Sequence, residues 1–302
     1  MWQPKLMSSL DASQTSAISR LFSSAVFREM AKRGRSATFA RLFAQCGIEG
    51  ACPANATVGE GFDRAFAVLK KAGLRDEYIY RAAVTHKILL GKHSLNTACM
   101  LTEFRAGKSK ADLVILNGTA TVFEIKSERD SLARLANQVE NYKKVFAAVN
   151  VIASEAHVGG VLATVSDDVG VMCLSRRYSI STIRDASDRP DRISPVIVFE
   201  SLRSGEARNI LRKLGVHVPD VPNTMMHVAM REAFSHLEPI ALHRAMVDVL
   251  KGTRNLAPLG RLVDRLPPSL HAAALSIQVR PREHEHLVQA VSTPLPSAML
   301  WA

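Results

Sequence analysis

Two apolar runs joined by an Asn-Gly pair constrain the fold of this chain more than any other feature. Residues 113–116 read Leu-Val-Ile-Leu, and residues 121–126 read Thr-Val-Phe-Glu-Ile-Lys. Asn117-Gly118 between them favours a tight turn, so the pattern predicts an antiparallel β-hairpin. A loop of two to four residues places Asp112 opposite Glu124 or one of its neighbours. Opposed Cβ atoms lie about 5 Å apart, and we therefore expect the two carboxylates side by side.

Side-chain alternation along the second strand separates chemistry from packing. Glu124 and Lys126 share one face, whereas Phe123 and Ile125 point into a core. The carboxylates of Asp112 and Glu124 suit Mg²⁺, and a nearby lysine can orient an attacking water and offset the charge of a phosphoryl transition state. The alternative is an edge hairpin whose charged side chains face water and form only a weak surface pair.

The segments around the hairpin predict a mixed α/β unit. The apolar spacing after Lys126 indicates a helix from Ser127 to about Val149, with Ser127 and Asp130 resembling a capping box. The expected order is α-β-β-β-α-β with one further strand. The other expected elements are a helix near 76–90, a strand at 97–103, a strand at 150–153, a helix at 155–164 and a strand at 170–174.

This block, residues 76–175, resembles the PD-(D/E)XK nuclease superfamily. Asp112, Glu124 and Lys126 match its motif, although Ala111 stands where the motif has proline. The resemblance implies a restriction-endonuclease-like αβββαβ core with a mixed central sheet. It also implies a Mg²⁺- or Mn²⁺-dependent deoxyribonuclease in which Asp112, Glu124 and the backbone carbonyl of Ile125 hold the metal. Lys126 would position the attacking water.

Further site residues follow from the same resemblance. Gln138 and Tyr142 match the Q-x-x-x-Y element of RecB-like members, where such side chains hold substrate or order the site. The alternative places Tyr142 in the core and Gln138 on a solvated helix face. Glu103 is the candidate accessory acid, unless it pairs with Arg105 or faces solvent. His86 matches the position of a manganese ligand in some RecB-like members, unless it is a surface or packed residue.

The charge balance points to a polyanionic partner. The chain carries 39 Lys and Arg against 28 Asp and Glu, a net charge of +11. The excess lies in residues 1–97 and 201–302, while residues 98–200 are balanced. Such flanks attract nucleic acid, and we expect DNA as the partner. The candidate phosphate contacts are Lys108, Lys110, Arg129 and Arg134, whereas Lys143 and Lys144 fit a solvated helix face better.

The flanking regions are expected to be mainly helical. We divide the chain into a basic N-terminal region at 1–75, the nuclease-like domain at 76–195 and a C-terminal region at 196–302. The first region either binds DNA or is a bundle that binds nothing, and the last could serve oligomerisation or partner choice. Helices are expected at 15–32, 37–46, 201–214, 225–249 and 260–266, with a loop at 47–61. Packing or surface positions suit the C-terminal histidines better than metal binding: His227, His236, His243, His271, His284 and His286.

Several classes lack their usual signatures. The four cysteines show no C-x-x-C spacing, and no P-loop, G-x-G-x-x-G or G-x-S-x-G motif is present. With no long apolar segment, we expect a cytoplasmic protein without a membrane partner. The alternative to an enzyme is a nuclease-like fold that binds nucleic acid or a protein without turnover, and a homo-oligomer or a partner protein stays open. By analogy, the expected setting is phage defence, DNA repair or mobile-element processing.

Overall fold

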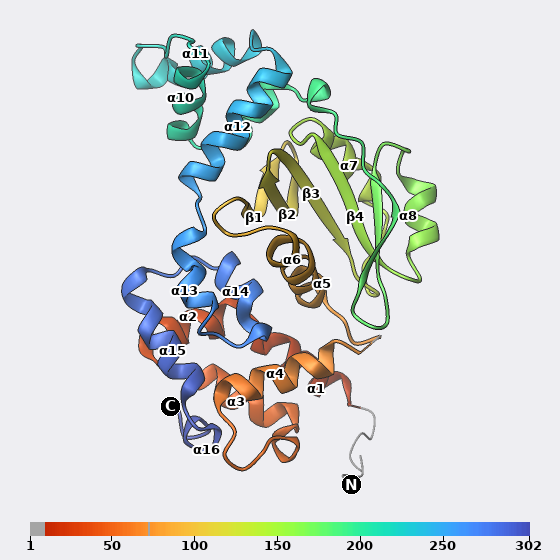
Figure 1. Cartoon of the computed structure of the whole chain (residues 1–302), viewed down its shortest axis with the longest axis vertical. Coiled ribbons are helices and arrows are strands. Elements are labelled where there is room, and N and C mark those ends of the chain that lie inside the picture. The colour runs from red at the N-terminus through yellow and green to blue at the C-terminus, as the bar shows by residue number, and fades with distance from the viewer. Residues whose placement is uncertain (1–9, 72) are drawn as a thin grey trace. The chain divides into compact units, whose positions relative to one another are not determined.

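The computed structural model describes residues 10–71 and 73–302 (Figure 1). The chain forms two units. Unit 1 comprises the described residues up to Ala82 together with Leu259–Ala302, and unit 2 comprises Ala83–Pro258. The region expected at 196–302 is thus divided between the units. Among the described residues, no helix has both the length and the apolar character needed to cross a membrane.

Unit 1 is helical. Its first two helices are separated at Phe22-Ser23, where a single helix over 15–32 was expected, whereas the helix expected at 37–46 is confirmed. Gly34 and Gly47 end two of these helices with left-handed φ of 67° and 65°. The helices are α1 (Ala12–Leu21), α2 (Ser24–Arg33), α3 (Ala37–Cys46), α4 (Val58–Leu69), α13 (Gly260–Val263), α14 (His271–Ser276), α15 (His284–Ser292) and α16 (Leu295–Ala298), with short turns η1 (Glu49–Ala51), η5 (Pro268–Leu270) and η6 (Pro281–Glu283).

Unit 2 is built on one six-stranded mixed sheet, which confirms the expected α/β class. Its strands lie in the order β1-β2-β3-β4-β5-β6. The first three are antiparallel, β3, β4 and β5 are parallel, and β6 is antiparallel to β5. The strands are β1 (Cys99–Ala106), β2 (Ser109–Asn117), β3 (Thr119–Lys126), β4 (Ala148–Ser154), β5 (Gly170–Leu174) and β6 (Ile180–Arg184).

The predicted hairpin is present as β2 and β3. Gly118, with φ of 74°, forms the turn between the paired residues Asn117 and Thr119. The ladder continues to Leu113 opposite Phe123, so the next position in this register sets Asp112 opposite Glu124. Because β3 lies between β2 and β4, the alternative of a water-facing edge hairpin is wrong.

The helix expected from Ser127 to Val149 is much shorter in the structure. α7 spans Leu135–Lys143, and the buried strand β4 already begins at Ala148. Ser127 N and Oγ both donate to Asp130 Oδ2, at 2.8 and 2.7 Å. This side-chain arrangement closes a turn instead of starting a helix. A capping-box pattern therefore marked a turn eight residues before the helix.

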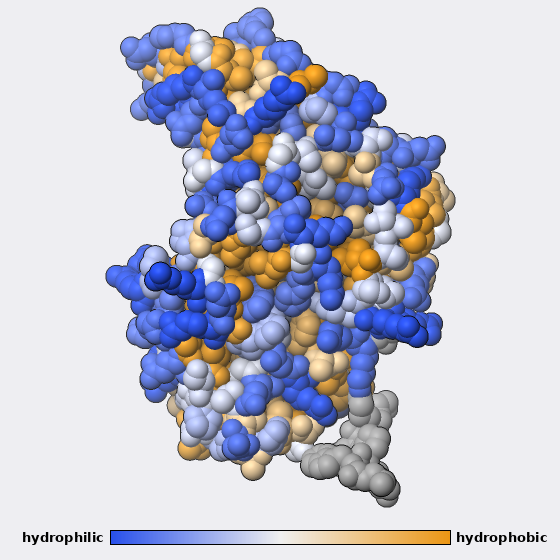
Figure 2. Space-filling model, in the orientation of Figure 1, coloured by the Kyte–Doolittle hydropathy of each residue, from blue (hydrophilic) through white to orange (hydrophobic). Residues whose placement is uncertain are grey.

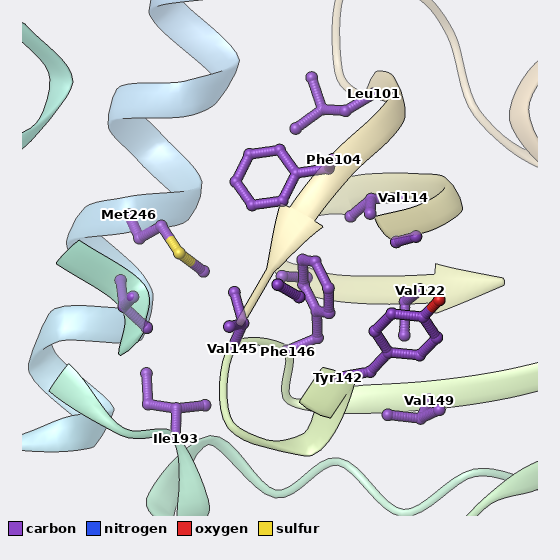
Figure 3. Close-up of a cluster of buried hydrophobic side chains, with 14 of the residues drawn as sticks. Leu101, Phe104, Val114, Val122, Tyr142, Val145, Phe146, Val149, Ile193 and Met246 are labelled. Atoms are coloured by element: carbon purple, nitrogen blue, oxygen red, sulfur yellow. The ribbon is translucent and has the colours of Figure 1, made fainter. Parts of the chain in front are cut away.

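Helices cover both faces of the sheet. One face carries Val114, Val122 and Val151 and packs against α7 and α12 in a continuous apolar cluster (Figure 3). On the other face, Thr85 Oγ1 lies 3.6 Å from the Met100 sulfur. The helix expected at 76–90 consists of α5 (Glu77–Val84), a π-helical turn η2 (Thr85–Leu89) and α6 (Leu90–Lys92). The remaining helices are α8 (Val158–Thr164), α9 (Pro195–Ser201), α10 (Ser204–Lys213), α11 (Asn223–Ser235) and α12 (Pro239–Thr253), with short turns η3 (Pro190–Arg192) and η4 (Ala257–Leu259).

Candidate active site

Three carboxylate residues form a row across the first three strands. The β1–β2 register brackets Glu103 and Asp112 between the pairs Thr102–Leu113 and Phe104–Ala111. The β2–β3 register then sets Asp112 opposite Glu124. Carboxylate oxygens of Glu103 and Asp112 lie within 4.8 Å of each other. Strand pairing therefore brings together the acids that the sequence separates by up to twenty-one positions.

The backbone is irregular at this row. Glu103 has φ of 53°, a left-handed conformation that non-glycine residues seldom adopt. In β1 the side chains that belong to the apolar cluster change here from odd to even positions, from Cys99 and Leu101 to Phe104 and Ala106. Such a phase change re-aims one side chain within a strand, as β-bulges do. Glu103 consequently stays exposed, and its Oε2 accepts a hydrogen bond from Lys110 Nζ at 3.2 Å, not from Arg105.

Glu124 and Lys126 form a buried pair. Lys126 Nζ donates to Glu124 Oε1 at 2.8 Å and to Gln138 Oε1 at 3.0 Å. The two charged side chains are only 2% and 7% exposed, for Glu124 and Lys126 respectively. Phe123 and Ile125 are buried on the opposite face, as the alternation predicts. A buried charge pair is retained only with such hydrogen bonds, since desolvation otherwise opposes it.

Tyr142 completes this network. Its hydroxyl lies 2.7 Å from Glu124 Oε2 and 2.7 Å from the Lys110 backbone carbonyl oxygen. Burial, reinforced by the neighbouring Glu124 carboxylate, raises the pKa of Tyr142, so the hydroxyl stays protonated and able to donate. Figure 3 shows its ring inside the apolar cluster with the hydroxyl at the edge. Tyr142 is therefore both a core residue and a partner of Glu124, and Gln138 is a partner of Lys126.

The side chain of Asp112 on β2 is hydrogen bonded to the backbone of β3. Ile125 N donates to Asp112 Oδ2 at 2.8 Å. The amide and carbonyl of a strand residue point toward the same neighbouring strand. The Ile125 carbonyl therefore lies on the Asp112 side, beyond the last ladder pair Leu113–Phe123.

These donors fit a hard divalent cation. Carboxylate and carbonyl oxygens are the ligands that Mg²⁺ and Mn²⁺ prefer, and Asp112, Glu103 and the Ile125 carbonyl converge on one end of the hairpin. Glu124 already has one hydrogen bond on each oxygen, but a carboxylate offers about four lone-pair sites. Neighbouring carboxylates also occur without a metal, so the donor set permits an ion and does not show one.

The basic candidates divide into exposed and structural side chains. Lys108, Lys110, Arg129 and Arg134 are all exposed. Lys143, by contrast, donates to Ser166 Oγ at 2.6 Å and to Asp168 Oδ1 at 3.0 Å, which makes it part of a structural network.

The sequence did not indicate that the backbone carbonyl of Lys110 contacts the hydroxyl of Tyr142. A backbone contact does not depend on the residue type and leaves no pattern in the sequence.

His86, His93 and His243 lie in different surroundings. His86 is in the π-helical turn η2, a distortion that often accompanies functional sites. His93 Nδ1 lies 2.9 Å from Asn117 Nδ2, at the turn end of the hairpin and thus away from Asp112. His243 is buried on α12 with Nε2 3.2 Å from Ala120 N. Packing, as expected, explains His243.

Comparison with known proteins identifies relatives of this chain. Protein cII of Enterobacteria phage P4 is 37% identical over 132 residues, which are 42% of this chain and 50% of the phage protein. The chain thus spans about half the length of this curated relative. A solved structure of a protein of unknown function from Silicibacter pomeroyi matches with 17% identity and a TM-score of 0.30, over 46% of this chain and 92% of that protein. A likeness at that TM-score supports no conclusion. The family model for bacteriophage P4 protein cII matches residues 70–255, which is more than half of the chain, and the chain therefore belongs to the bacteriophage P4 protein cII family.

Proposed function

We propose that this chain is a divalent-metal-dependent nuclease that hydrolyses phosphodiester bonds in DNA. The observation that carries the proposal is the position of Lys126, whose ammonium is fixed by Glu124 and Gln138 on the strand that pairs with Asp112. A surface lysine needs no such support. A buried lysine held by one carboxylate and one amide oxygen has the placement expected of a group that acts on a phosphate or a water.

The sheet topology supports a restriction-endonuclease-like core. Three antiparallel strands, a helix and a fourth strand parallel to the third match the expected βββαβ order. The candidate residues lie near the end of β3 that leads towards α7, with Gln138 and Tyr142 on that helix. The superfamily assignment is part of the proposal and rests on this order together with Asp112, Glu124 and Lys126.

Each residue of the proposed site has a distinct task. Asp112, the Ile125 carbonyl and Glu124 would hold Mg²⁺ or Mn²⁺, with Glu103 as the accessory acid. When bound, such an ion supplies Lewis-acid activation of a phosphoryl oxygen and of water. Lys126 holds the attacking water by hydrogen bonding and offsets negative charge on the phosphate. Gln138 and Tyr142 act as positioning residues, because one fixes Lys126 and the other fixes Glu124.

DNA is the substrate class that the surroundings favour. Lys108 lies in the turn between β1 and β2, and Arg129 and Arg134 lie in the segment between β3 and α7. All three are exposed, and among the described residues they take part in no ion pair. Phosphate contacts of this kind position a duplex or a strand without reading its sequence. A phage protein among the relatives accords with a role in mobile-element DNA.

One observation favours a second candidate, a nuclease-like module that binds nucleic acid or protein without turnover. Both Glu124 oxygens are already hydrogen bonded, to Lys126 and to Tyr142, in a nearly water-free environment. A purely structural role would account for that closure. The two candidates differ in turnover and can be separated by assay.

The deciding experiment measures cleavage and binding together. The full chain is incubated with labelled single-stranded, double-stranded and branched DNA in Mg²⁺, Mn²⁺ or EDTA. Metal-dependent cleavage that is lost in Asp112→Asn and Lys126→Met but kept in the exposed-lysine control Lys144→Ala supports the nuclease. Binding without cleavage in every metal establishes the second candidate. Cleavage that persists in both site variants contradicts the assigned site.

A further inference from the structure

A basic site lies in unit 1, far in sequence from the carboxylate row. A pocket of about 450 Å³ is lined by Lys32, Arg280, Arg282, Glu283 and His286. Lys32 comes from the end of α2, Arg280 directly precedes η6, and the others come from η6 and α15. α2 packs against α15, and a Cβ added at Gly34 would lie 3.9 Å from the His286 carbonyl oxygen. We call this site the basic pocket.

The cations of the basic pocket are not neutralised by the protein. Among the described residues, Lys32, Arg280 and Arg282 take part in no ion pair. The one lining acid, Glu283, uses Oε2 to accept from Arg280 N at 3.0 Å. The next acid on α15, Glu285, binds Arg265. The pocket therefore has three positive charges against one, and hydrophilic residues gather over this part of unit 1 in Figure 2.

The two arginines are carried by a fixed turn. Arg280 N donates to Glu283 Oε2, and Glu283 N donates to the Arg280 carbonyl oxygen at 2.8 Å. Pro281 between the arginines limits the backbone further. A turn closed from both sides fixes the backbone that carries the two exposed arginines. Guanidinium groups bind phosphate through paired, charge-assisted hydrogen bonds.

We propose that the basic pocket binds backbone phosphates of DNA. Its volume is in the range of small-ligand sites, and its lining holds no Phe, Tyr or Trp ring on which a base could stack. Guanidinium and ammonium groups without a stacking surface recognise the phosphate rather than the base. Nucleic acid as the source of that phosphate rests on the proposed function, whereas the recognition of phosphate rests on the pocket alone.

The test is DNA binding in EDTA, where no cleavage can contribute. Fluorescence anisotropy of a labelled duplex is measured across salt concentrations with the full chain, with Arg280→Ala/Arg282→Ala, and with the control Arg20→Ala/Arg41→Ala. The control removes the same charge from exposed arginines of unit 1 that do not line the pocket. The pocket variant should bind about tenfold more weakly, and its log Kd against log salt slope should fall by about 2. The control should change binding by less than about twofold.

Other outcomes overturn the proposal. An equal loss of DNA affinity in both double variants would mean that only the net charge matters. A pocket variant that binds DNA as tightly as the wild type would exclude DNA as the ligand of the basic pocket. Titration with inorganic phosphate distinguishes DNA from a small anion as the ligand. If the pocket variant loses affinity for inorganic phosphate but keeps its affinity for DNA, the pocket binds a small anion. Unchanged circular dichroism and melting temperature are required of both variants. If the wild type does not cleave DNA in Mg²⁺ but the pocket variant shows the expected loss of DNA binding, the nuclease assignment is wrong and the basic pocket remains a DNA-binding site.

Discussion

The hydroxyl of Tyr142 meets the carboxylate of Glu124 at 2.7 Å inside the apolar cluster beneath the sheet. The same hydroxyl lies 2.7 Å from the Lys110 carbonyl oxygen, so one side chain of α7 joins β2 to β3. Glu124 in turn holds Lys126. The candidate site is therefore supported from the core, and its geometry depends on residues that do not touch solvent.

Tyr142→Phe should lower both stability and activity. The change removes one hydroxyl and leaves Glu124 Oε2 and the Lys110 carbonyl without that donor, at a cost of about 1–3 kcal/mol in the free energy of unfolding. Urea denaturation measures the loss. Cleavage should fall with little change in DNA binding, because Tyr142 orders Glu124 and is itself buried. A variant as stable as the wild type would contradict the pairing.

A double variant can separate structure from chemistry in the buried pair. Lys126→Met alone leaves Glu124 as an uncompensated buried charge, and we expect a loss of about 3–5 kcal/mol in unfolding free energy. Glu124→Gln/Lys126→Met removes both charges and should recover most of that stability. Activity should be absent from both proteins. A double variant that regains cleavage along with stability would show that the pair has only a structural role.

Local patterns predicted those parts of unit 2 that depend on neighbouring residues. The hairpin, β5 and the burial of Phe123 and Ile125 follow from alternation and from Asn117-Gly118. The predicted start of α7 was wrong, because Ser127 and Asp130 make the same hydrogen bonds in a turn that they would make at the start of a helix. Secondary-structure patterns do not distinguish these two outcomes.

Contacts between residues far apart in the chain could not be predicted from the sequence. His243 reaches Ala120 across 123 positions, and the basic pocket joins Lys32 to Arg280. Neither pairing has a periodic signal. Glu103 was identified as a candidate acid, but its left-handed φ could not be inferred, because only the register of β1 against β2 creates the irregular position.

His243 should make stability depend on pH below neutrality. Burial lowers the pKa of His243 from 6.5, with Arg244 acting in the same direction and Asp188 opposing it. Its Nε2 accepts from Ala120 N and must stay unprotonated to do so. The unfolded chain therefore binds the proton more readily than the folded one. This contribution is complete above about pH 6.5 and is lost as the pH falls toward the folded-state pKa.

The measurement for His243 is urea denaturation at pH 7.5 and 5.5. Wild type and the exposed-residue control His217→Gln should lose stability on acidification by similar amounts. His243→Gln should lose less between the two pH values, although it is less stable at pH 7.5. An equal pH dependence in all three proteins would contradict the role of His243.

Glu103 should trade stability for metal binding. Its left-handed φ of 53° costs a non-glycine residue about 1–2 kcal/mol, and glycine adopts this conformation freely. Glu103→Gly should therefore raise the unfolding free energy. The gain is limited to about 1 kcal/mol, because glycine also has more conformational entropy in the unfolded chain. Glu103→Gln keeps the strained backbone and removes only the charge. If Glu103 assists metal binding next to Asp112, both variants should need more Mn²⁺ than the wild type for half-maximal thermal stabilisation, while only the glycine variant is more stable in EDTA. Mn²⁺ titrations that are identical for all three proteins would remove Glu103 from the site, and a glycine variant less stable than Glu103→Gln would show that the left-handed conformation carries no strain.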